Sequence, residues 1–329
     1  EFMSVGVQNY VVGPFMIPMS EELNWTRAEY TLPRTIGGFV TAFTGFIVGA
    51  YLDQWGPRRF MLVGALILSL ALYFLSEINQ LWHWVLLNGV VLTVGSALIG
   101  NLVVNVTLIK WFVDFRGRAI ALAAMGISFA GVILTPLTTW AIDTYSWRFA
   151  WQLLALGTLI FVLPAALLMR RAPEDYGLRP DGRSNQDYRE GLTKKATVDF
   201  NRSLTRRQAL KSRTFYSLVI AFTLFTVTIH VMLLQTVPFM TDAGYDRTTA
   251  ALMITTISVP AMLAKPVWGW LIDGLQKPRL LAAASSITSA SALFIIVHAA
   301  NVNQLDLLIA GFLLSVSYTH LTLPTNREV

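Results

Sequence analysis

The sequence contains no cysteine, and charged residues make up only 13% of its 329 positions. The missing cysteine excludes disulfides and thiolate metal sites. Soluble domains usually carry about 25% charged residues, whereas here hydrophobic residues reach 54% and the mean hydropathy is +0.55. The sequence also lacks a metal-spaced cluster of histidine and acidic residues, a serine triad and a phosphate-binding glycine loop. We therefore expect a membrane protein that is not an enzyme and takes no cofactor or metal.

Long apolar runs recur along the chain, and each approaches the roughly 20 residues that a helix needs to cross a bilayer. The opening residues Glu1 to Met3 do not have the basic start and cleavage site of a signal peptide. We predict an all-α polytopic protein with ten spans, at about residues 2–19, 29–51, 60–76, 83–110, 116–140, 148–169, 214–238, 248–272, 279–299 and 303–316.

The net charge of +6 has its source in the loops between these spans. Nineteen of the 25 basic residues lie in loops on one side of the membrane, twelve of them in segment 170–213, and three lie in loops on the other side. This positive-inside pattern predicts a cytoplasmic N-terminus and central loop in a multi-pass plasma-membrane protein, which in a bacterium means the inner membrane. A nucleic-acid binder would instead carry its basic patch on a folded polar domain. We expect the lipid bilayer, and no nucleic acid, as a partner.

The chain repeats itself at a distance of 220 residues. Gly49-Ala50-Tyr51-Leu52-Asp53 closes one apolar run, Gly269-Trp270-Leu271-Ile272-Asp273 closes another, and the same offset pairs Arg27 with Arg247. Duplicated halves are how many secondary transporters build a substrate site between two bundles. We predict an N-terminal six-helix bundle at 1–170, a cytoplasmic linker at 171–213 and a partial C-terminal bundle at 214–316.

The end of the chain departs from this repeat. By the 220-residue offset the tenth span should continue to about residue 328, but the sequence turns polar after Val316 and contains Pro324 close to its final charges. Neither feature suits a lipid-facing helix. We expect 317–329 to be a non-native tail, so that the sequence holds about ten of twelve spans.

The loop between the second and third spans carries a recognisable motif. The residues from Gly49 to Arg59, GAYLDQWGPRR, resemble the loop 2–3 signature of the major facilitator superfamily. That resemblance implies the major facilitator fold of two six-helix bundles, in which this loop latches the two halves in the outward-facing state. The alternative is that these are only turn and topology residues. The gating residues implied by the resemblance are Gly49, Asp53, Gly56, Arg58, Arg59 and, in the second copy, Asp273.

Three further stretches resemble the bacterial monocarboxylate and oxalate/formate branch of this superfamily. They are Lys110-Trp111-Phe112, Arg116-Gly117-Arg118-Ala119 and RAPEDYGLRPDG at 171–182. This resemblance implies a monomeric symporter or antiporter that moves a small organic anion, a mono- or dicarboxylate, by alternating access. One alternative is a drug or metabolite efflux carrier that is indifferent to substrate charge. A more remote one is a transporter-derived membrane sensor or scaffold.

Lys265 is the principal candidate for contact with the substrate. It lies inside the eighth span, where a cation costs roughly 2.5–3.5 kcal/mol on insertion scales, and Pro266 interrupts the helix ladder beside it. The surrounding sequence resembles the monocarboxylate-transporter motif in which an arginine before proline binds the substrate carboxylate. Lysine replaces that arginine here, and Ala261 replaces the acid of the proton-coupled carriers. The alternative is a lysine that snorkels to the membrane surface near Asp273.

Other polar residues inside the spans complete the candidate site. His230 in the seventh span offers a coupling proton, because an unperturbed histidine has a pKa near 6.5, although a hydrogen-bonded core histidine is the alternative. Spans one, four, seven and ten line the central cavity of this fold. We therefore expect further substrate contacts, with helix-to-helix hydrogen bonds as the equal alternative, from Gln8, Tyr10, Asn101 and Asn105.

Two expectations concern packing and charge in the second and fifth spans. Arg34 lies about one turn inside the second span, and we expect it to pair with Glu29 or Glu77. Small residues such as Gly131, together with Pro136, predict a close crossing and a bend in the fifth span.

Overall fold

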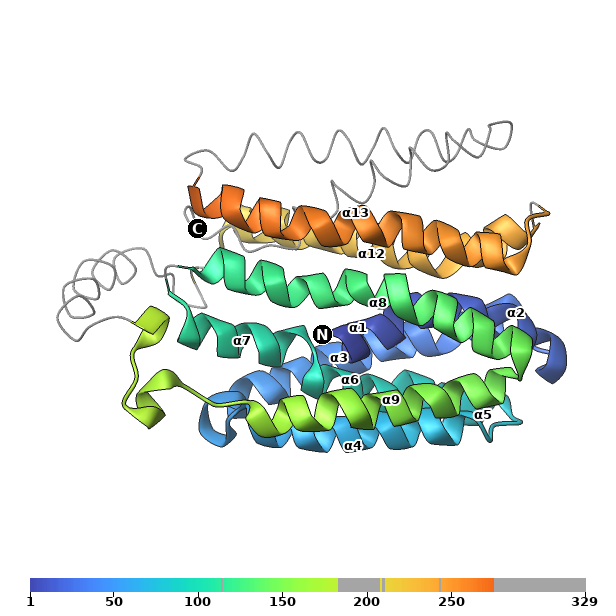
Figure 1. Cartoon of the computed structure of the whole chain (residues 1–329), viewed down its shortest axis with the longest axis horizontal. Coiled ribbons are helices and arrows are strands. Elements are labelled where there is room, and N and C mark those ends of the chain that lie inside the picture. The colour runs from blue at the N-terminus through green and yellow to red at the C-terminus, as the bar shows by residue number, and fades with distance from the viewer. Residues whose placement is uncertain (114, 183–207, 209–210, 243, 275–329) are drawn as a thin grey trace.

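The computed structural model of the protein describes residues 1–113, 115–182, 208, 211–242 and 244–274. Every regular element within these ranges is helical, and the long helices run roughly along the longest axis of the molecule (Figure 1). The predicted all-α fold is thereby confirmed. The ninth and tenth predicted spans, at 279–299 and 303–316, and the tail at 317–329 lie outside the described residues.

The helices follow the predicted spans to within a few residues. The first span comprises α1 (Phe2–Gly6), the π-helical η1 (Val7–Val11) and α2 (Val12–Leu23), followed by α3 (Arg27–Trp55) and α4 (Pro57–Leu75). The fourth span comprises α5 (Leu81–Trp84), the π-helical η2 (Val85–Leu92), α6 (Thr93–Ile99) and α7 (Asn101–Trp111). The remaining elements are α8 (Arg116–Thr144), α9 (Trp147–Leu168), the 3-10 helices η3 (Pro173–Tyr176) and η4 (Pro180–Gly182), α12 (Arg213–Asp242) and α13 (Arg247–Gly274).

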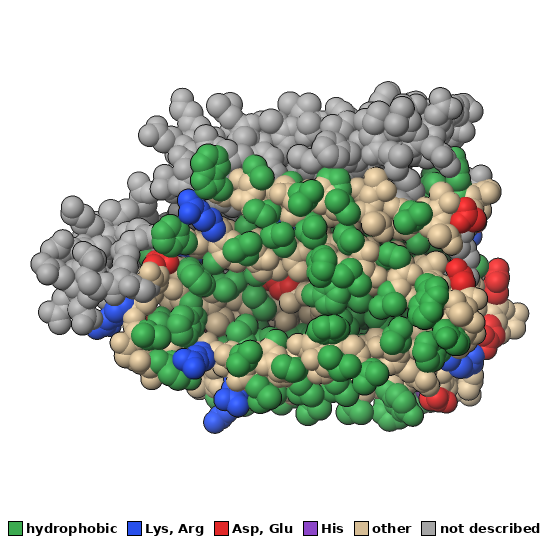
Figure 2. Space-filling model, in the orientation of Figure 1, with side chains coloured by type: hydrophobic (Ala, Val, Ile, Leu, Met, Phe, Trp, Pro, Cys, Tyr) green, Lys and Arg blue, Asp and Glu red, His purple; other side chains and the backbone are tan. Residues whose placement is uncertain are grey.

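Within the described residues, six segments are long and apolar enough to cross a membrane, by length and composition. They are 27–55, 57–75, 81–111, 116–144, 147–168 and 248–267. Large apolar side chains on these helices face outward, for example Phe39, which is 77% exposed, and Phe46, which is 73% exposed. Figure 2 shows the same arrangement: apolar side chains cover the middle of the visible face, and most charged ones lie toward its two ends. Such a surface suits a lipid environment.

The connections between helices gather at the two ends of the molecule. We call the end with the connections near residues 24–26, 76–80, 145–146 and 244–246 the Arg27 end. The opposite end, with residues 53–57, 111–113, 115–116 and 169–182, is the Asp53 end (Figure 1). The turn between α3 and α4 depends on Gly56, which has a φ of 74° that favours glycine, and on Pro57 at the first position of α4. At the other end Thr26 caps α3 in a capping box with Glu29.

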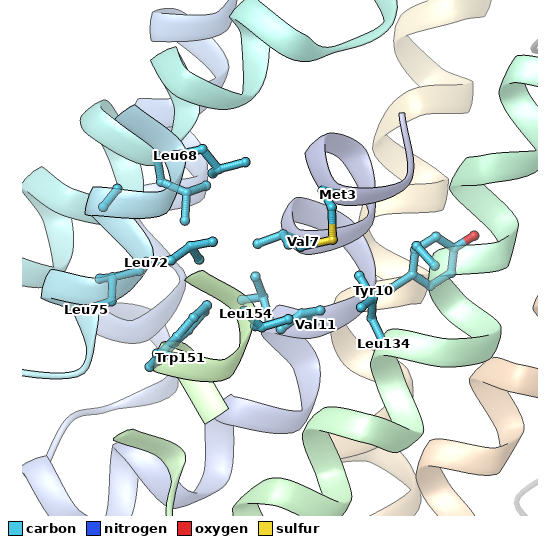
Figure 3. Packing of buried hydrophobic residues seen from close by; sticks show 14 of the residues in the cluster. Met3, Val7, Tyr10, Val11, Leu68, Leu72, Leu75, Leu134, Trp151 and Leu154 are labelled. Atoms are coloured by element: carbon cyan, nitrogen blue, oxygen red, sulfur yellow. The ribbon is translucent and has the colours of Figure 1, made fainter. Parts of the chain in front are cut away.

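The main core of the N-terminal helices lies between the first span, α4 and α9. Figure 3 shows Met3, Val7 and Val11 directed toward leucines of α4 and toward Leu154 and Trp151 of α9. Tyr10 points to the opposite side of the first span, toward α8. Since lipid tails are as apolar as these side chains, close packing holds the helices together in a membrane.

The predicted span at 83–110 is present as the segment 81–111, but its helix is interrupted at Gly100. This residue has φ −87° and ψ −164°, which separates α6 from α7. Hydrogen bonds connect the helical turn before this break to the first span. Ser4 Oγ donates to Ser96 O at 2.8 Å, and Ser96 Oγ donates to Ser4 O at 2.9 Å. A carbonyl released from the helix ladder thus finds a partner inside the protein, as a membrane requires.

Candidate functional site

Lys265 of α13 lies inside the protein and is only 1% exposed. Its Nζ donates hydrogen bonds to the Ala124 carbonyl oxygen at 2.6 Å and to Ser128 Oγ at 2.8 Å, and both acceptors belong to α8. Both acceptors are electrically neutral. The ammonium is therefore directed across a helix–helix interface and is closed off from solvent.

Tyr10 and Ser258 lie next to this contact, on either side of a narrow point in α8. A methyl group at Gly131 would lie 2.6 Å from Tyr10 Cε1 and would also collide with Ser258 Oγ. The first span, α8 and α13 therefore meet where α8 has no side chain. This confirms the close crossing predicted for the fifth span.

The polar side chains at this crossing form a buried group, which we call the polar cluster: Tyr10, Ser128, Ser258 and Lys265. Their exposed fractions are 2%, 0%, 0% and 1%. The Tyr10 hydroxyl lies within reach of both serine hydroxyls. Ser258 Oγ nevertheless makes no hydrogen bond of acceptable geometry within the described part of the chain. The cluster thus holds one positive charge and hydroxyl groups, one of which is uncommitted.

The direction of Tyr10 depends on the local form of the first span. Residues 7–11 form a π-helix, a wider turn that is frequent at functional sites. Within it Val7 and Val11 face the core, whereas Tyr10 faces α8 (Figure 3). Thr135 Oγ1 of α8 donates a hydrogen bond to the Tyr10 carbonyl at 3.2 Å, which ties the two helices together at this level.

One carboxylate lies within electrostatic range of Lys265, and it belongs to Glu1 at the start of the first span. Its Oε2 is buried and makes no hydrogen bond to the described residues. The position where proton-coupled carriers have an acid, Ala261, is buried and apolar. Sequence reasoning missed Ser128 and Glu1 as neighbours of Lys265, and Ser258 as a neighbour of Tyr10. The run of small residues around Gly131 was the signal in the sequence that pointed to this crossing.

Among the other predicted substrate contacts, Gln8, Asn101 and Asn105 make no hydrogen bond to Lys265. Gln8 is half-buried in η1, and Asn101 is exposed at the start of α7. Asn105 is half-buried, and its Oδ1 is enclosed without a hydrogen-bond partner in the described chain. His230 lies within α12, but its side chain is outside what the structure describes. The structure therefore brings Tyr10 close to Ser128, which bonds to Lys265, and shows no such contact for Gln8, Asn101 or Asn105 within the described residues.

At the Asp53 end, the predicted gating aspartate is held within the N-terminal helices. Asp53 Oδ1 pairs with Lys110 Nζ of α7 at 2.5 Å, and Arg171 Nη1 donates to the Asp53 carbonyl at 3.3 Å. Arg171 also forms two hydrogen bonds to Asp175, at 2.9 and 2.7 Å, and these hold the pKa of Asp175 below its usual value. The start of the predicted linker is thereby fixed to the motif.

The rest of the gating motif contributes shape and positive charge. A methyl group at Gly56 would lie 3.4 Å from the Arg171 Cβ, so the tight turn and the linker start pack together. Arg58 and Arg59 are exposed at this end, and the Gly49 position has no neighbour within 4 Å in the described chain. Asp273 lies within α13, and its side chain is outside the described set.

At the Arg27 end, an ion pair joins the N-terminal helices to α12. The Arg27 guanidinium of α3 makes two parallel hydrogen bonds to the Asp242 carboxylate, each of 2.7 Å. These bonds hold the pKa of Asp242 below its usual value. A second pair at this end, Glu22 with Arg148, connects α2 to α9 and so stays within the N-terminal helices.

The predicted pairing of Arg34 with Glu29 or Glu77 is wrong. Both the backbone nitrogen and the hydroxyl of Thr26 donate to the Glu29 carboxylate, at 2.8 and 2.7 Å, so the capping box occupies it. The Glu77 carboxylate faces Ser76. The Arg34 Nη2 is enclosed and makes no hydrogen bond within the described residues.

A polytopic helical bundle with a buried cation at a helix crossing, and with ion pairs at both ends, has the architecture of a membrane transporter. Comparison with known families agrees with this class. The chain matches the Major Facilitator Superfamily over residues 2–326, and it belongs to that family of transporters.

Named transporters are similar to this chain, with about a quarter of the aligned residues identical. Monocarboxylate transporter 11 of Mus musculus is 28% identical over 75% of this chain and 52% of its own length. Monocarboxylate transporter 13 of Rattus norvegicus is 24% identical over 87% of this chain and 63% of its own length. Glycerol-3-phosphate transporter of Bacillus subtilis is 26% identical over 60% and 44%. The chain thus spans between 44% and 63% of the length of these relatives.

Solved structures establish the same fold. A proton:xylose symporter bound to 6-bromo-6-deoxy-D-glucose superimposes with a TM-score of 0.73, at 12% identity, over 97% of this chain and 77% of its own. A D-xylose-proton symporter gives a TM-score of 0.66 at 13% identity with the same coverage. At such identity the likeness concerns the fold alone, and it confirms the predicted major facilitator architecture.

Proposed function

We propose that this protein is a secondary active transporter of a small organic anion, a mono- or dicarboxylate, and that it works by alternating access. The observation that carries the proposal is the buried ammonium of Lys265 between α8 and α13, surrounded by neutral acceptors and by one carboxylate in electrostatic range. A charge held at such a depth is a functional-site hypothesis in any membrane protein. The monocarboxylate transporters among the relatives support the same substrate class.

In this proposal Lys265 supplies a point charge to the substrate carboxylate. Tyr10 shapes the site from the first span, since its hydroxyl lies beside the serine that holds Lys265. Gln8, Asn101 and Asn105 contact the substrate in other states of the transport cycle. His230, the remaining candidate, carries a coupling proton.

The proposed transport cycle moves two bundles, residues 1–170 and 214–316, against each other around this site. The Asp53 end faces the cytoplasm, because Arg58, Arg59 and Lys110 lie there with the basic linker. The Asp53 motif stabilises one gate state, and the Arg27–Asp242 pair holds the opposite end together. Lipid is the surrounding partner, and the carrier works as a monomer.

Uptake of a labelled panel into proteoliposomes with the full-length carrier tests this proposal. Acetate, L-lactate, oxalate and succinate provide the anions, and xylose provides an uncharged comparison. We expect saturable uptake of at least one carboxylate, loss of that uptake in Lys265→Ala, and partial activity in Lys265→Arg. Lys211→Ala, which removes an exposed linker cation, is the matched control and should transport normally.

Two results would contradict the proposal. Unchanged carboxylate uptake in Lys265→Ala would remove the proposed anchor. Transport of xylose or of an uncharged amphiphile with no response to any carboxylate would instead favour an efflux carrier of the same superfamily.

A further inference from the structure

We propose that Ser128 is a positioning residue that, with the Ala124 carbonyl, holds Lys265 across the α8–α13 interface in the empty carrier. An incoming carboxylate must replace the hydrogen bonds between the ammonium and α8 before the two helices can separate. The carrier therefore exchanges one anion for another faster than its empty binding site returns across the membrane. This inference rests on the proposed function, and it adds a transport mode and a residue that acts through Lys265.

In the empty carrier, two acceptors of α8 occupy the Lys265 ammonium that the substrate carboxylate would otherwise bind. Ala124 and Ser128 are one helical turn apart, so their acceptor atoms lie on the same face of α8, and they contact Nζ at 2.6 and 2.8 Å. Ser128 is fully buried, and it belongs to a helix 137 residues away from Lys265 in the chain. The two hydrogen bonds therefore connect two helices that no short loop joins.

The chemistry of the two acceptors favours their replacement by an anion. A carbonyl and a hydroxyl satisfy the donors of an ammonium but leave its charge in place, whereas a carboxylate neutralises it. All these hydrogen bonds are charge-assisted, because the ammonium is the donor, but only the carboxylate adds a Coulomb attraction between opposite charges. A carboxylate that reaches Lys265 thus competes with Ser128 and Ala124 for the same N–H donors.

This competition links binding to movement. While Lys265 is bonded to α8, separation of α8 from α13 leaves a buried ammonium with fewer partners, which is unfavourable in a low-dielectric interior. Once the substrate carries the ammonium's hydrogen bonds, separation no longer breaks them. A ligand shifts an equilibrium only through different affinities for two states, and here the difference has its source in the two α8 acceptors.

A plain substrate contact by Ser128 would give a different result. If Ser128 bound the substrate directly, its removal would weaken binding and raise the KM. If Ser128 competes with the substrate, its removal lowers the KM or leaves it unchanged. The two roles are therefore distinguished by the direction of the KM change.

The first experiment compares exchange with net efflux of L-lactate and of oxalate from proteoliposomes containing the full-length carrier. In the unaltered protein we expect exchange to exceed net efflux by at least tenfold. Ser128→Ala should reduce that ratio about tenfold, because one of two charge-assisted bonds is lost. Thr138→Val is the control, since the Thr138 hydroxyl is buried on α8 but bonds only to carbonyls of its own helix. An unchanged ratio in Ser128→Ala, or a raised KM, would overturn the inference.

A second measurement has a decisive arm that keeps Ser128 intact, so that arm does not depend on the folding of Ser128→Ala. The given sequence has no cysteine, so Ser258→Cys, made in a full-length carrier in which any cysteine outside this sequence is replaced by serine, provides a single thiol at a fully buried position of the same interface. With Ser128 intact, the anion that is transported should increase modification of this thiol by a small maleimide severalfold. In the Ser128→Ala background, modification should be fast without anion. If the rate of modification with Ser128 intact were the same with and without the anion, the proposed role of Ser128 would be contradicted.

The two proposals fail separately. If the unaltered carrier transports none of the carboxylates in the panel, the organic-anion function falls and the Ser128 lock falls with it. If the carrier transports a carboxylate but Ser128→Ala behaves as the unaltered protein does, only the Ser128 inference is lost.

Discussion

The two sides of the first span are packed in opposite ways. On one side Met3, Val7 and Val11 meet apolar side chains of α4 and α9 in a core with no charge among the residues drawn (Figure 3). On the other side Tyr10 meets α8 near two serines and a lysine, all of them buried. The first junction suits contacts that stay fixed through a transport cycle. The second holds hydrogen bonds that one anion can replace, so it suits contacts that are broken and made again.

The largest expected effect lies on the apolar side. Trp151 is fully buried and stacks on Phe15 with ring centroids 3.9 Å apart. Trp151→Ala should lower the free energy of unfolding by about 3–5 kcal/mol, measured as a lower thermal midpoint in detergent. Protein that stays folded should retain the KM of the unaltered carrier. A changed KM at unchanged stability would show that the two sides are not separate.

A smaller loss of stability but a strong loss of transport is expected at Gly131. Gly131→Ala places a methyl group where Tyr10 and Ser258 already lie, so the ring must shift, at about 1–3 kcal/mol. We expect transport to fall at least tenfold. The control is Gly157→Ala on α9, whose new methyl group would meet only Met3 Cε at 3.7 Å in the described chain. Equal activity of the two variants would mean that the crossing at α8 has no special role.

The third prediction concerns the Arg27 end, where one ion pair reaches α12 and another does not. Arg27→Ala should open this end and increase labelling of a cysteine at Met240, a residue of α12 that is 3% exposed. The increase should not exceed about fivefold, because exposed ion pairs contribute little. Arg148→Ala removes the pair with Glu22 inside the N-terminal helices and should leave the labelling unchanged. The same increase in both variants would show a general loosening.

The smallest effect is expected from pH. Arg27 holds the pKa of Asp242 below its usual value, which is about 3.9. The contribution of this carboxylate is therefore complete above its unfolded pKa and is lost only as the pH falls through the lower folded value. Between about pH 5 and pH 8 the ratio of transport rates of Arg27→Ala and the unaltered carrier should stay constant. A ratio that changes near pH 6 would point to a titrating group other than Asp242.

Most of the fold follows from the sequence because its signals are local. A run of about 20 apolar residues defines a span wherever it occurs, and Gly56-Pro57 defines a turn from its own backbone preferences. The break at Gly100 could not be predicted in this way. It depends on the reciprocal hydrogen bonds between Ser4 and Ser96, which lie 92 residues apart.

The candidate site shows the same limit. Lys265 was predictable because a cation within an apolar run is conspicuous by itself. Its partner Ser128 was not, since a single serine in a helix gives no signal until the fold places it opposite the lysine. The prediction for Arg34 was wrong for a related reason: Thr26, the N-cap of the same helix, occupies the Glu29 carboxylate that lies close to Arg34 in the sequence.

The contacts that fix Arg171 and Asp181 at the Asp53 end determine how much of the linker is left to connect the two halves of the chain. The Val113 nitrogen donates to Asp181 Oδ2 at 3.0 Å, and Arg171 is fixed at Asp53, so the segment up to residue 181 travels with the N-terminal helices. Only the part of the linker after Asp181 is therefore left to connect the two halves of the chain before α12 starts at Arg213. Motion of the N-terminal helices carries residues 171–181 with it. The stretch of chain available between the halves is thus shorter than the linker that the sequence predicts.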